Sequence, residues 1–246
     1  MLLANIRIVL VEPLGERNIG SVARVMKNMG LSQLVLVNPQ CDPWSEAARH
    51  MAVHGGEVLA QAVAVASLPE ALQGCQRAVA TTARDRHLPR PLETPRQVLP
   101  WLLAGATYPV ALIFGREDRG LSNAELDQAQ RFLGIPAHPD YPSLNLAQAV
   151  AVCAYELYQQ TLEPRAALAD LAPAPQAPLE ALEDYYQHLE AVLLQIGFLY
   201  PHTAAARMAK LRRLGHRAQL SPAELALLRG FLRQVEWAIA NASPQA

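Results

Sequence analysis

Three short segments of this chain combine polar side chains with the small residues that let a ligand approach the backbone. Residues 18–24 read Asn-Ile-Gly-Ser-Val-Ala-Arg, residues 114–117 read Phe-Gly-Arg-Glu with Gly-Leu-Ser-Asn at 120–123, and residues 143–145 read Ser-Leu-Asn. Each segment lies where an apolar run gives way to a loop or a helix. Glycine at a strand end permits close approach to the main chain, while guanidinium, hydroxyl and amide groups bind phosphates and sugar hydroxyls.

Arg24 is the strongest charged candidate of the three segments. It lies about one and a half turns into a predicted helix, whose free N-terminal amides favour anions. A guanidinium there could hold a phosphate in a bidentate manner. A surface ion pair explains Arg24 better when the residue is taken by itself.

The loop from Gly15 to Gly20 has the Gly-x-x-x-x-Gly spacing of a phosphate-binding loop. Ser21 and Val22 follow it instead of Lys and Ser or Thr, so the cation that would meet the phosphates is missing. The chain also lacks Gly-x-Gly-x-x-Gly. These patterns argue against a nucleoside triphosphatase and against a dinucleotide-binding domain.

The elements that must position these segments alternate between strands and helices. Apolar runs rich in β-branched residues predict strands, and helical spacing separates them. The predicted strands are Ile6 to Val11, Leu34 to Val37, Ala78 to Thr82, Val110 to Phe114 and Phe132 to Ile135. This order predicts an α/β fold, a parallel sheet sandwiched by helices.

Helix boundaries are marked by capping residues. Asn18 is predicted to cap the helix that Gly30 ends. Two capping boxes are predicted, Ser67 with Glu70 and Ser122 with Glu125.

The composition changes after a predicted helix over residues 144–162. Residues 163–178 are rich in proline and alanine and read as a linker. Helical spacing then returns over 179–196, 203–214 and 222–240, and the last of these begins at a Ser-Pro-x-Glu start signal. We therefore predict three parts: an α/β domain over 1–162, a linker over 163–178 and a small all-α C-terminal module over 179–246.

The overall composition is that of a globular protein. Of 246 residues, 51% are hydrophobic and 17% charged, and no apolar run approaches the roughly 20 residues of a membrane helix. The N-terminal segment lacks a basic leader and a cleavage site, which predicts a cytoplasmic protein. Cys41, Cys75 and Cys153 are odd in number and far apart, so we expect reduced thiols.

The formal net charge of −1 hides two basic clusters. The first falls between residues 84 and 90 and the second between 207 and 217, where no acidic residue intervenes. Their members are Arg84, Arg86, His87 and Arg90, and Arg207, Lys210, Arg212, Arg213 and Arg217. Such clusters are typical of nucleic-acid contacts, although a solvated helix face explains the second equally well by itself.

Other constellations are weaker. His50 and His54 have i, i+4 spacing but no third ligand nearby, so we interpret them as structural. His138 and Asp140 could serve acid-base chemistry, although hydrogen bonding within their loop is the simpler role. Aromatic residues total only 6%, so no base-stacking platform is predicted.

Taken in order, the three segments resemble the signatures of the SPOUT class of RNA methyltransferases. The resemblance covers the first 160 residues and is closest to the TrmJ-type family of tRNA ribose methyltransferases, which also has a helical C-terminal extension. It rests on Thr-Thr-Ala-Arg at 81–84, on Gly-Arg-Glu-x-x-Gly-Leu-Ser-Asn at 115–123 and on that extension. It implies methylation of the ribose 2′-hydroxyl of a cytidine or uridine at position thirty-two, in the tRNA anticodon loop.

The resemblance also implies roles for individual residues. Arg24, Ser143 and Asn145 are then catalytic, and S-adenosylmethionine is the methyl donor, with no metal required. The cofactor-binding residues are expected to be Thr81, Thr82, Ala83, Gly115, Ile135, Pro142, Ser143 and Leu144. The RNA-binding residues are expected to be Arg84, Arg86, Arg207, Lys210, Arg212 and Arg213.

The resemblance further implies a trefoil knot and a homodimer in which the partner completes each active site. Pro142 departs from the family pattern, since a small polar residue is expected before Ser143.

An arginine is effectively always protonated and is a poor proton acceptor. We therefore expect Arg24 to hold the neighbouring phosphate and polarise the 2′-hydroxyl, with the proton leaving to that phosphate or to solvent. Two alternatives stay open at this point: a ribose methyltransferase for another tRNA position or for ribosomal RNA, and a non-catalytic RNA-binding module.

Overall fold

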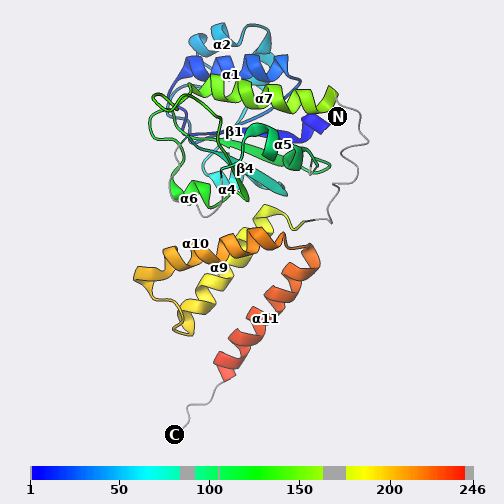
Figure 1. The fold of residues 1–246 in the computed structure, drawn as a ribbon. Helices are drawn as coiled ribbons and strands as arrows, with labels where there is room; N and C mark the ends of the chain where they lie inside the picture. Colours follow the sequence, from blue (N-terminus) through cyan, green and yellow to red (C-terminus); the bar gives the residue numbers. More distant parts are fainter. Residues whose placement is uncertain (1, 84–91, 105, 163–175, 242–246) are drawn as a thin grey trace. The chain divides into compact units, whose positions relative to one another are not determined.

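The chain divides into two compact units, Met1–Pro173 and Ala174–Ala246. The computed structural model describes residues 2–83, 92–104, 106–162 and 176–241, and Figure 1 shows its elements. Most of the predicted linker, residues 163–175, lies outside the described residues. No helix in these ranges is both long and apolar enough to cross a membrane.

The first unit is built on a sheet of six parallel strands in the order β3-β2-β1-β5-β4-β6. The strands are β1 (Ile6–Val11), β2 (Gln33–Val37), β3 (Val63–Val65), β4 (Arg77–Thr81), β5 (Val110–Phe114) and β6 (Arg131–Leu133). The predicted α/β fold with a parallel sheet is confirmed. Strand β3 was not predicted, although residues 62–66 read Ala-Val-Ala-Val-Ala. It is only three residues long and lies at the edge of the sheet, where Val63 is exposed.

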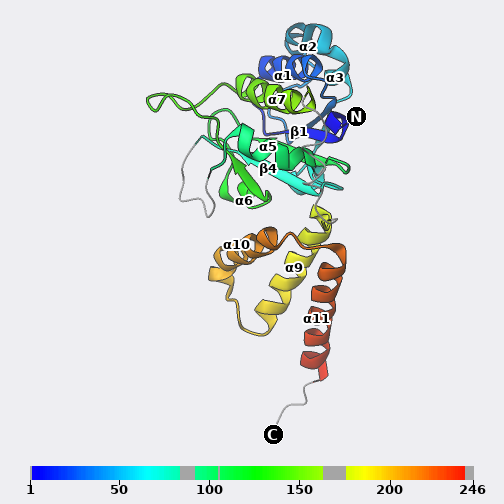
Figure 2. The same ribbon diagram turned by 45° about the vertical axis from the view of Figure 1, so that its right-hand side comes forward.

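Helices cover the sheet in the first unit. They are the 3₁₀-helices η1 (Leu2–Asn5) and η2 (Val53–Gly55), and α1 (Glu16–Asn28), α2 (Glu46–Ala52), α3 (Gly56–Ala60), α4 (Leu68–Ala71), α5 (Pro95–Ala104), α6 (Asn123–Leu126) and α7 (Leu146–Leu162). Helix α1 packs against α2 and α7, and α5 packs against α7. Helices α1, α2 and α7 gather on one side of the sheet in both views (Figures 1 and 2).

The core lies between this sheet and its helices. All five residues of β5 are buried, so the strand is covered on both faces, as parallel strands require. Ile19 and Met26 of α1 and Val150 of α7 are fully buried in the same cluster. This packing holds the strand ends, and the loops that follow them, in fixed positions.

The helix starts agree in part with the sequence. Ser122 and Glu125 form the predicted capping box. Ser67 caps α4, but the Glu70 carboxylate accepts from the amide of Ala66 instead of the cap residue. The predicted cap at Asn18 is wrong: α1 begins at Glu16 with Gly15 as its N-cap, and the Asn18 side chain is engaged elsewhere.

The second unit consists of three helices, α9 (Leu179–Gln195), α10 (Pro201–Ala218) and α11 (Pro222–Asn241). Helix α9 packs against both others. The buried side chains include Tyr186 of α9, Met208 of α10 and Leu232 of α11. The predicted start of α11 is confirmed, because the Ser221 hydroxyl accepts from the amide of Glu224, whose carboxylate accepts from the amide of Ser221.

Candidate active site

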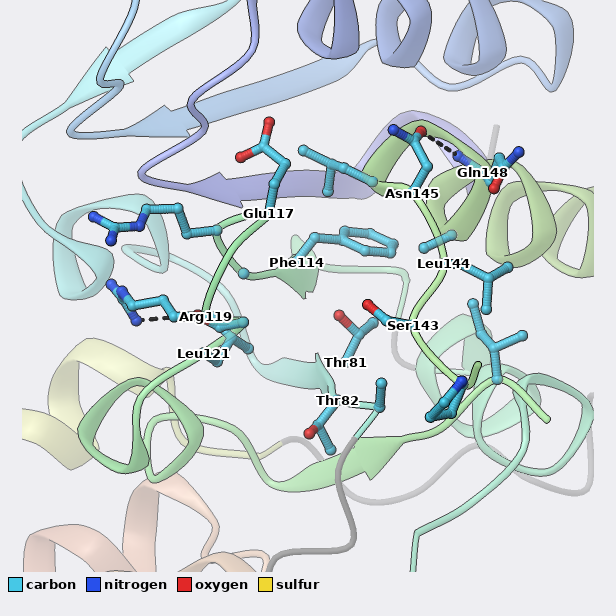
Figure 3. Close-up of a pocket in the computed structure, with 18 of the residues that line it drawn as sticks. Thr81, Thr82, Phe114, Glu117, Arg119, Leu121, Ser143, Leu144, Asn145 and Gln148 are labelled. Carbon is cyan, nitrogen blue, oxygen red and sulfur yellow. Dashed lines mark hydrogen bonds between the residues drawn. The ribbon is translucent and has the colours of Figure 1, made fainter. Parts of the chain in front are cut away.

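A cavity of about 680 Å³ opens in the first unit at the carboxyl ends of β4 and β5. Its lining comes from residues 81–83, 114–121 and parts of 133–149, with Asn18 of α1 beside them. Figure 3 shows how Thr81, Glu117 and Ser143, from three of these segments, lie around the cavity. Ligands of parallel α/β sheets bind at this edge, and the volume is that of a pocket for a cofactor-sized molecule.

The residues predicted to bind the cofactor come together in this cavity. They belong to segments that are far apart in the sequence, and all of them are part of its lining. They are Thr81, Thr82, Ala83, Gly115, Ile135, Pro142, Ser143 and Leu144. Two of the predicted catalytic residues, Ser143 and Asn145, line it as well.

Glu117 joins the loop after β5 to the start of α1. One carboxylate oxygen accepts from the amide of Leu14 at 2.9 Å. The other accepts from the amide of Gly15 at 3.1 Å and from Nδ2 of Asn18 at 3.0 Å. A carboxylate has several lone-pair positions, so the single Glu117 side chain can accept from all three donors of the segment 14–18.

Asn145 connects the third polar segment, residues 143–145, to Asn18. Its Nδ2 donates to Oδ1 of Asn18 at 3.0 Å. Its Oδ1 accepts from the amides of Ala147 at 2.9 Å and Gln148 at 3.4 Å, at the start of α7. The Glu117–Asn18–Asn145 chain of hydrogen bonds therefore connects all three polar segments and orients the turn that carries Ser143.

The sequence did not assign Asn18 and Glu117 to the site, although both stand within its segments. Asn18 was interpreted as a helix cap. Both residues follow the end of a predicted strand, and this position could have indicated a role in the site. The hydrogen bond between them joins residues about a hundred positions apart, and local sequence does not predict such a contact.

Gly115 permits the tight loop that forms one wall. A Cβ atom there would lie 2.3 Å from the carbonyl carbon of Gly120 and from the amide nitrogen of Leu121. Both neighbours are backbone and cannot move aside without opening the loop. The amide of Gly120 donates to the Arg116 carbonyl at 2.8 Å and closes it.

Charged side chains hold the outer part of this loop. Arg119 donates to Glu12 at 2.9 Å and to Glu125 at 3.0 Å. Burial raises the pKa of Glu125, but hydrogen bonds from Arg119 and Ser122 outweigh this and keep the pKa below its ordinary value. The ionised pair ties the loop to the end of β1 and to α6.

Arg24 does not join the other two predicted catalytic residues within one chain. It is exposed on α1 and is not part of the cavity lining. It lies six residues beyond Asn18, about 9 Å further along the helix axis. Within the described parts of the chain its side chain makes no hydrogen bond or ion pair, so the simpler interpretation as a surface ion pair is not supported there.

Comparison with known proteins follows the division of the chain. The model of the SpoU rRNA Methylase family matches residues 5–155, and the model of tRNA methyltransferase TrmJ, C-terminal domain, matches residues 180–245. The chain belongs to the SpoU methylase family. The first match contains the sheet, the cavity and the hydrogen-bonded chain of Glu117, Asn18 and Asn145.

Relatives within the SpoU methylase family extend over both units. A tRNA (cytidine/uridine-2′-O-)-methyltransferase TrmJ from Pectobacterium atrosepticum is 46% identical over 237 residues, which is 96% of this chain and 98% of the relative. The crystal structure of TrmJ from Z. mobilis ZM4 is 34% identical, with a TM-score of 0.81, and covers 94% of this chain and 98% of that one.

A shorter relative matches the methylase part. A structure described as giving insights into the 2-OH methylation of C/U34 on tRNA is 27% identical, with a TM-score of 0.50. The match covers 64% of this chain and 91% of that one. The TrmJ C-terminal domain therefore separates this SpoU methylase from the shorter relative.

The predicted RNA-binding residues of this SpoU methylase fall into three groups. Arg207 and Lys210 are exposed on α10, and Arg213 is half-buried there. Arg212 differs: its guanidinium forms an ion pair with Glu183, lies 4.8 Å from the Tyr186 ring centroid and leaves 15% of the side chain exposed. Arg84 and Arg86 lie outside the described residues.

The histidines and the aspartate of the weaker constellations are not part of this cavity's lining. No group of three or more potential metal ligands occurs among the described residues. His138 and Asp140 are highly exposed, and the amide of Asp140 donates to Nδ1 of His138 at 3.4 Å. This contact is the loop hydrogen bonding expected from the sequence.

Proposed function

We propose that this protein transfers a methyl group from S-adenosylmethionine to the ribose 2′-hydroxyl of a cytidine or uridine at position thirty-two of tRNA. One observation carries the proposal: the Glu117–Asn18–Asn145 chain of hydrogen bonds joins all three polar segments at one cavity. The relatives support the substrate, because those that match both units are named tRNA (cytidine/uridine-2′-O-)-methyltransferases.

The cavity fits the donor on two grounds. Its size suits a nucleoside with an amino-acid tail, and its wall around Gly115 and the 133–144 segment offers main-chain groups to an adenine. Thr81 to Ala83 would line the methionine side. S-adenosylmethionine supplies an electrophilic methyl group on a sulfonium, and the chain's task is to bind, orient and exclude water.

Ser143 and Asn145 are proposed to orient the ribose. The Ser143 hydroxyl makes no hydrogen bond within the described residues and lines the cavity. The Asn145 amide has two N–H donors, of which Asn18 takes one, so the second remains for a ribose oxygen. The family resemblance supports both roles.

Arg24 is proposed to act in the cavity of a second subunit. Its exposure on α1 and its absence from the cavity of its own chain support a homodimer. Helix α7 packs against α1 and exposes Tyr155, Tyr158 and Leu162, apolar groups that a partner would cover. In that position the guanidinium would hold the phosphate and polarise the 2′-hydroxyl, whose proton leaves to the phosphate or to solvent.

The remaining expectations belong to the same proposal. The family resemblance is the basis for proposing a trefoil knot in the domain over 1–162. The exposed basic residues of α10, with Arg84 and Arg86, would contact the tRNA backbone, and the module over 179–246 would extend this contact beyond the linker of 163–178. Arg212 does not belong to this contact surface, because its guanidinium pairs with Glu183. The cytoplasm, where tRNA is modified, is the proposed location.

The test is transfer of a labelled methyl group from S-adenosylmethionine to unmodified tRNA transcripts, with ribosomal RNA in parallel. A 2′-O-methyl group makes the adjacent phosphodiester resistant to alkali, which maps the product. Label at position thirty-two supports the proposal. Label at position thirty-four would favour the activity named for the shorter relative, and no label in any tRNA would contradict the proposal.

A further inference from the structure

The turn between α9 and α10 exposes two aromatic rings. Phe198 is 55% exposed and Tyr200 is 54% exposed, whereas Leu199 between them is 1% exposed. Figure 1 shows this turn at the far end of α9. Two exposed aromatic rings within three residues of one turn form a small apolar patch, and such patches can mark a binding surface.

The turn is held firmly, so its rings are displayed in fixed positions. Gly197 has a φ of +73° and ends α9, and the amides of Phe198 and Leu199 both donate to the Leu193 carbonyl at 3.0 Å. The Tyr200 carbonyl accepts from the amides of Thr203 and Ala204 at 2.9 Å as α10 begins. With Leu199 anchored in the core, the backbone cannot rotate Phe198 or Tyr200 inward.

A cation and a third ring accompany the exposed pair. Arg207 donates to the Phe198 carbonyl at 2.7 Å, and its guanidinium carbon lies 5.8 Å from the Phe198 ring centroid. The His202 ring stacks on Tyr200, with centroids 6.0 Å apart and an interplanar angle of 19°. Flat rings beside a guanidinium are the groups on which unpaired bases stack.

Charge identifies the occupant. No acidic residue occurs between Ile196 and Leu220, while five Lys and Arg residues do. Arg207 continues along α10 into the exposed Lys210 and Arg217, so the rings stand at one end of a basic face. An unpaired nucleotide has both the flat apolar base and the phosphate that this arrangement fits, whereas an apolar protein segment would offer no charge to the exposed Lys210 and Arg217.

We infer that Phe198 and Tyr200, with Arg207, form a stacking site for an unpaired base of the RNA substrate. The inference rests on the proposed tRNA substrate and adds a base-binding surface in the second unit, separate from the cavity of the first. The sequence predicted no such platform because the aromatic content is low. A low total does not reveal that one turn exposes two rings together with Arg207.

The test compares full-length variants for binding of an unmodified tRNA transcript. Phe198→Ala is expected to weaken binding about 5- to 30-fold. Phe198→Trp is expected to retain it, and Phe198→Leu, which keeps apolar volume but lacks a π face, to lose most of it. Phe231→Ala is the matched control, because Phe231 on α11 is 66% exposed and lies outside the basic face. We expect less than a twofold change there.

Salt dependence separates stacking from charge. Phe198→Ala should leave the slope of log K against log salt unchanged, whereas Arg207→Gln should reduce it by about one. In a second measurement, p-benzoylphenylalanine at position 198 should cross-link on irradiation to an unpaired nucleotide. Cross-links only to base-paired stems or to protein, or full rescue by Phe198→Leu, would overturn the inference.

The two proposals can fail separately. If the parent protein methylates tRNA but Phe198→Ala and Tyr200→Ala bind it like the parent, the stacking site is overturned and the enzymatic proposal stands. If no tRNA is methylated but the Phe198 variants still bind RNA more weakly, the stacking site stands and the enzymatic proposal fails.

Discussion

Nδ2 of Asn145 donates a hydrogen bond of 3.0 Å to Oδ1 of Asn18, a residue 127 positions earlier in the chain. The Asn18 amide in turn donates to Glu117. Three segments separated by loops, helices and strands thereby share one chain of hydrogen bonds beside the cavity. A change in any one member is transmitted to the others, which makes the chain testable by substitution.

Glu117→Gln should impair methyl transfer without unfolding the protein. Glutamine has one acceptor oxygen, and its amide group would face a donor from Leu14, Gly15 or Asn18. Because hydrogen bonds to charged groups contribute about 1.5–3 kcal/mol, we expect kcat to fall about 10- to 100-fold. Steady-state kinetics measures this. Glu57→Gln is the control, since that carboxylate is exposed, lies outside the cavity lining and pairs with Lys27 at the surface. Equal losses in both variants would contradict the role of Glu117.

Gly115→Ala should reduce cofactor affinity at least tenfold. The added Cβ would lie 2.3 Å from the backbone of Gly120 and Leu121, so the loop must open. Isothermal titration with S-adenosylmethionine measures the loss. Gly56→Ala serves as the control because a Cβ there meets nothing within 4 Å. Unchanged affinity in the Gly115 variant would show that this loop does not form the cofactor wall.

Gly215→Ala should destabilise the second unit. The new methyl group would lie 2.1 Å from the Tyr186 hydroxyl at the contact of α9 and α10. Overpacking of this kind costs about 1–3 kcal/mol. Gly230→Ala, in the middle of α11 with open space around it, should instead stabilise by about 0.5–1 kcal/mol through helix propensity. Urea unfolding of the two variants should move in opposite directions.

The ion pair between Glu183 and Arg212 should make the second unit sensitive to acid. Burial raises the pKa of Glu183, but the hydrogen bond and charge of Arg212 outweigh it and set the pKa below its ordinary value. A carboxylate with a lowered folded pKa stabilises fully above its unfolded pKa of about 4.3, and this contribution is lost as pH falls through the folded value. Thermal unfolding between pH 7 and 3 should show this loss, and Glu183→Gln should show less of it.

Mixed dimers can test whether Arg24 acts on the partner. Arg24→Ala should be inactive alone, and Gly115→Ala should keep at most about a tenth of the parent activity when S-adenosylmethionine is held below the parent Kd. If Arg24 serves the other subunit, co-assembly in equal amounts gives dimers with one intact site, and about a quarter of the parent activity should return. If Arg24 acts within its own chain, activity stays at the level of the separate variants after mixing. Subunit exchange is verified with two distinguishable tags.

The predictions from sequence agree with the structure for elements that depend on residues close together in the chain. The strands at Ile6–Val11 and Val110–Phe114 follow from uninterrupted apolar runs, because a buried parallel strand needs apolar side chains on both faces. The box at Ser122 and the start of α11 at Pro222 follow from capping groups within three residues of one another. The three polar segments could be recognised in the sequence because each consists of residues close together in the chain.

Tertiary structure decided what depends on distant partners. Arg212 and Lys210 are both cations of one basic run, yet only the fold turns Arg212 to Glu183 and Tyr186, because helix packing sets which side of α10 faces α9. Local sequence predicts Asn18 as a helix cap, whereas in the fold its side chain forms hydrogen bonds with Glu117 and Asn145. Local composition and spacing predict the α/β class and the residues able to do chemistry. The meeting of these residues at one cavity, and the display of Phe198 and Tyr200, were decided by long-range packing, which local spacing does not encode.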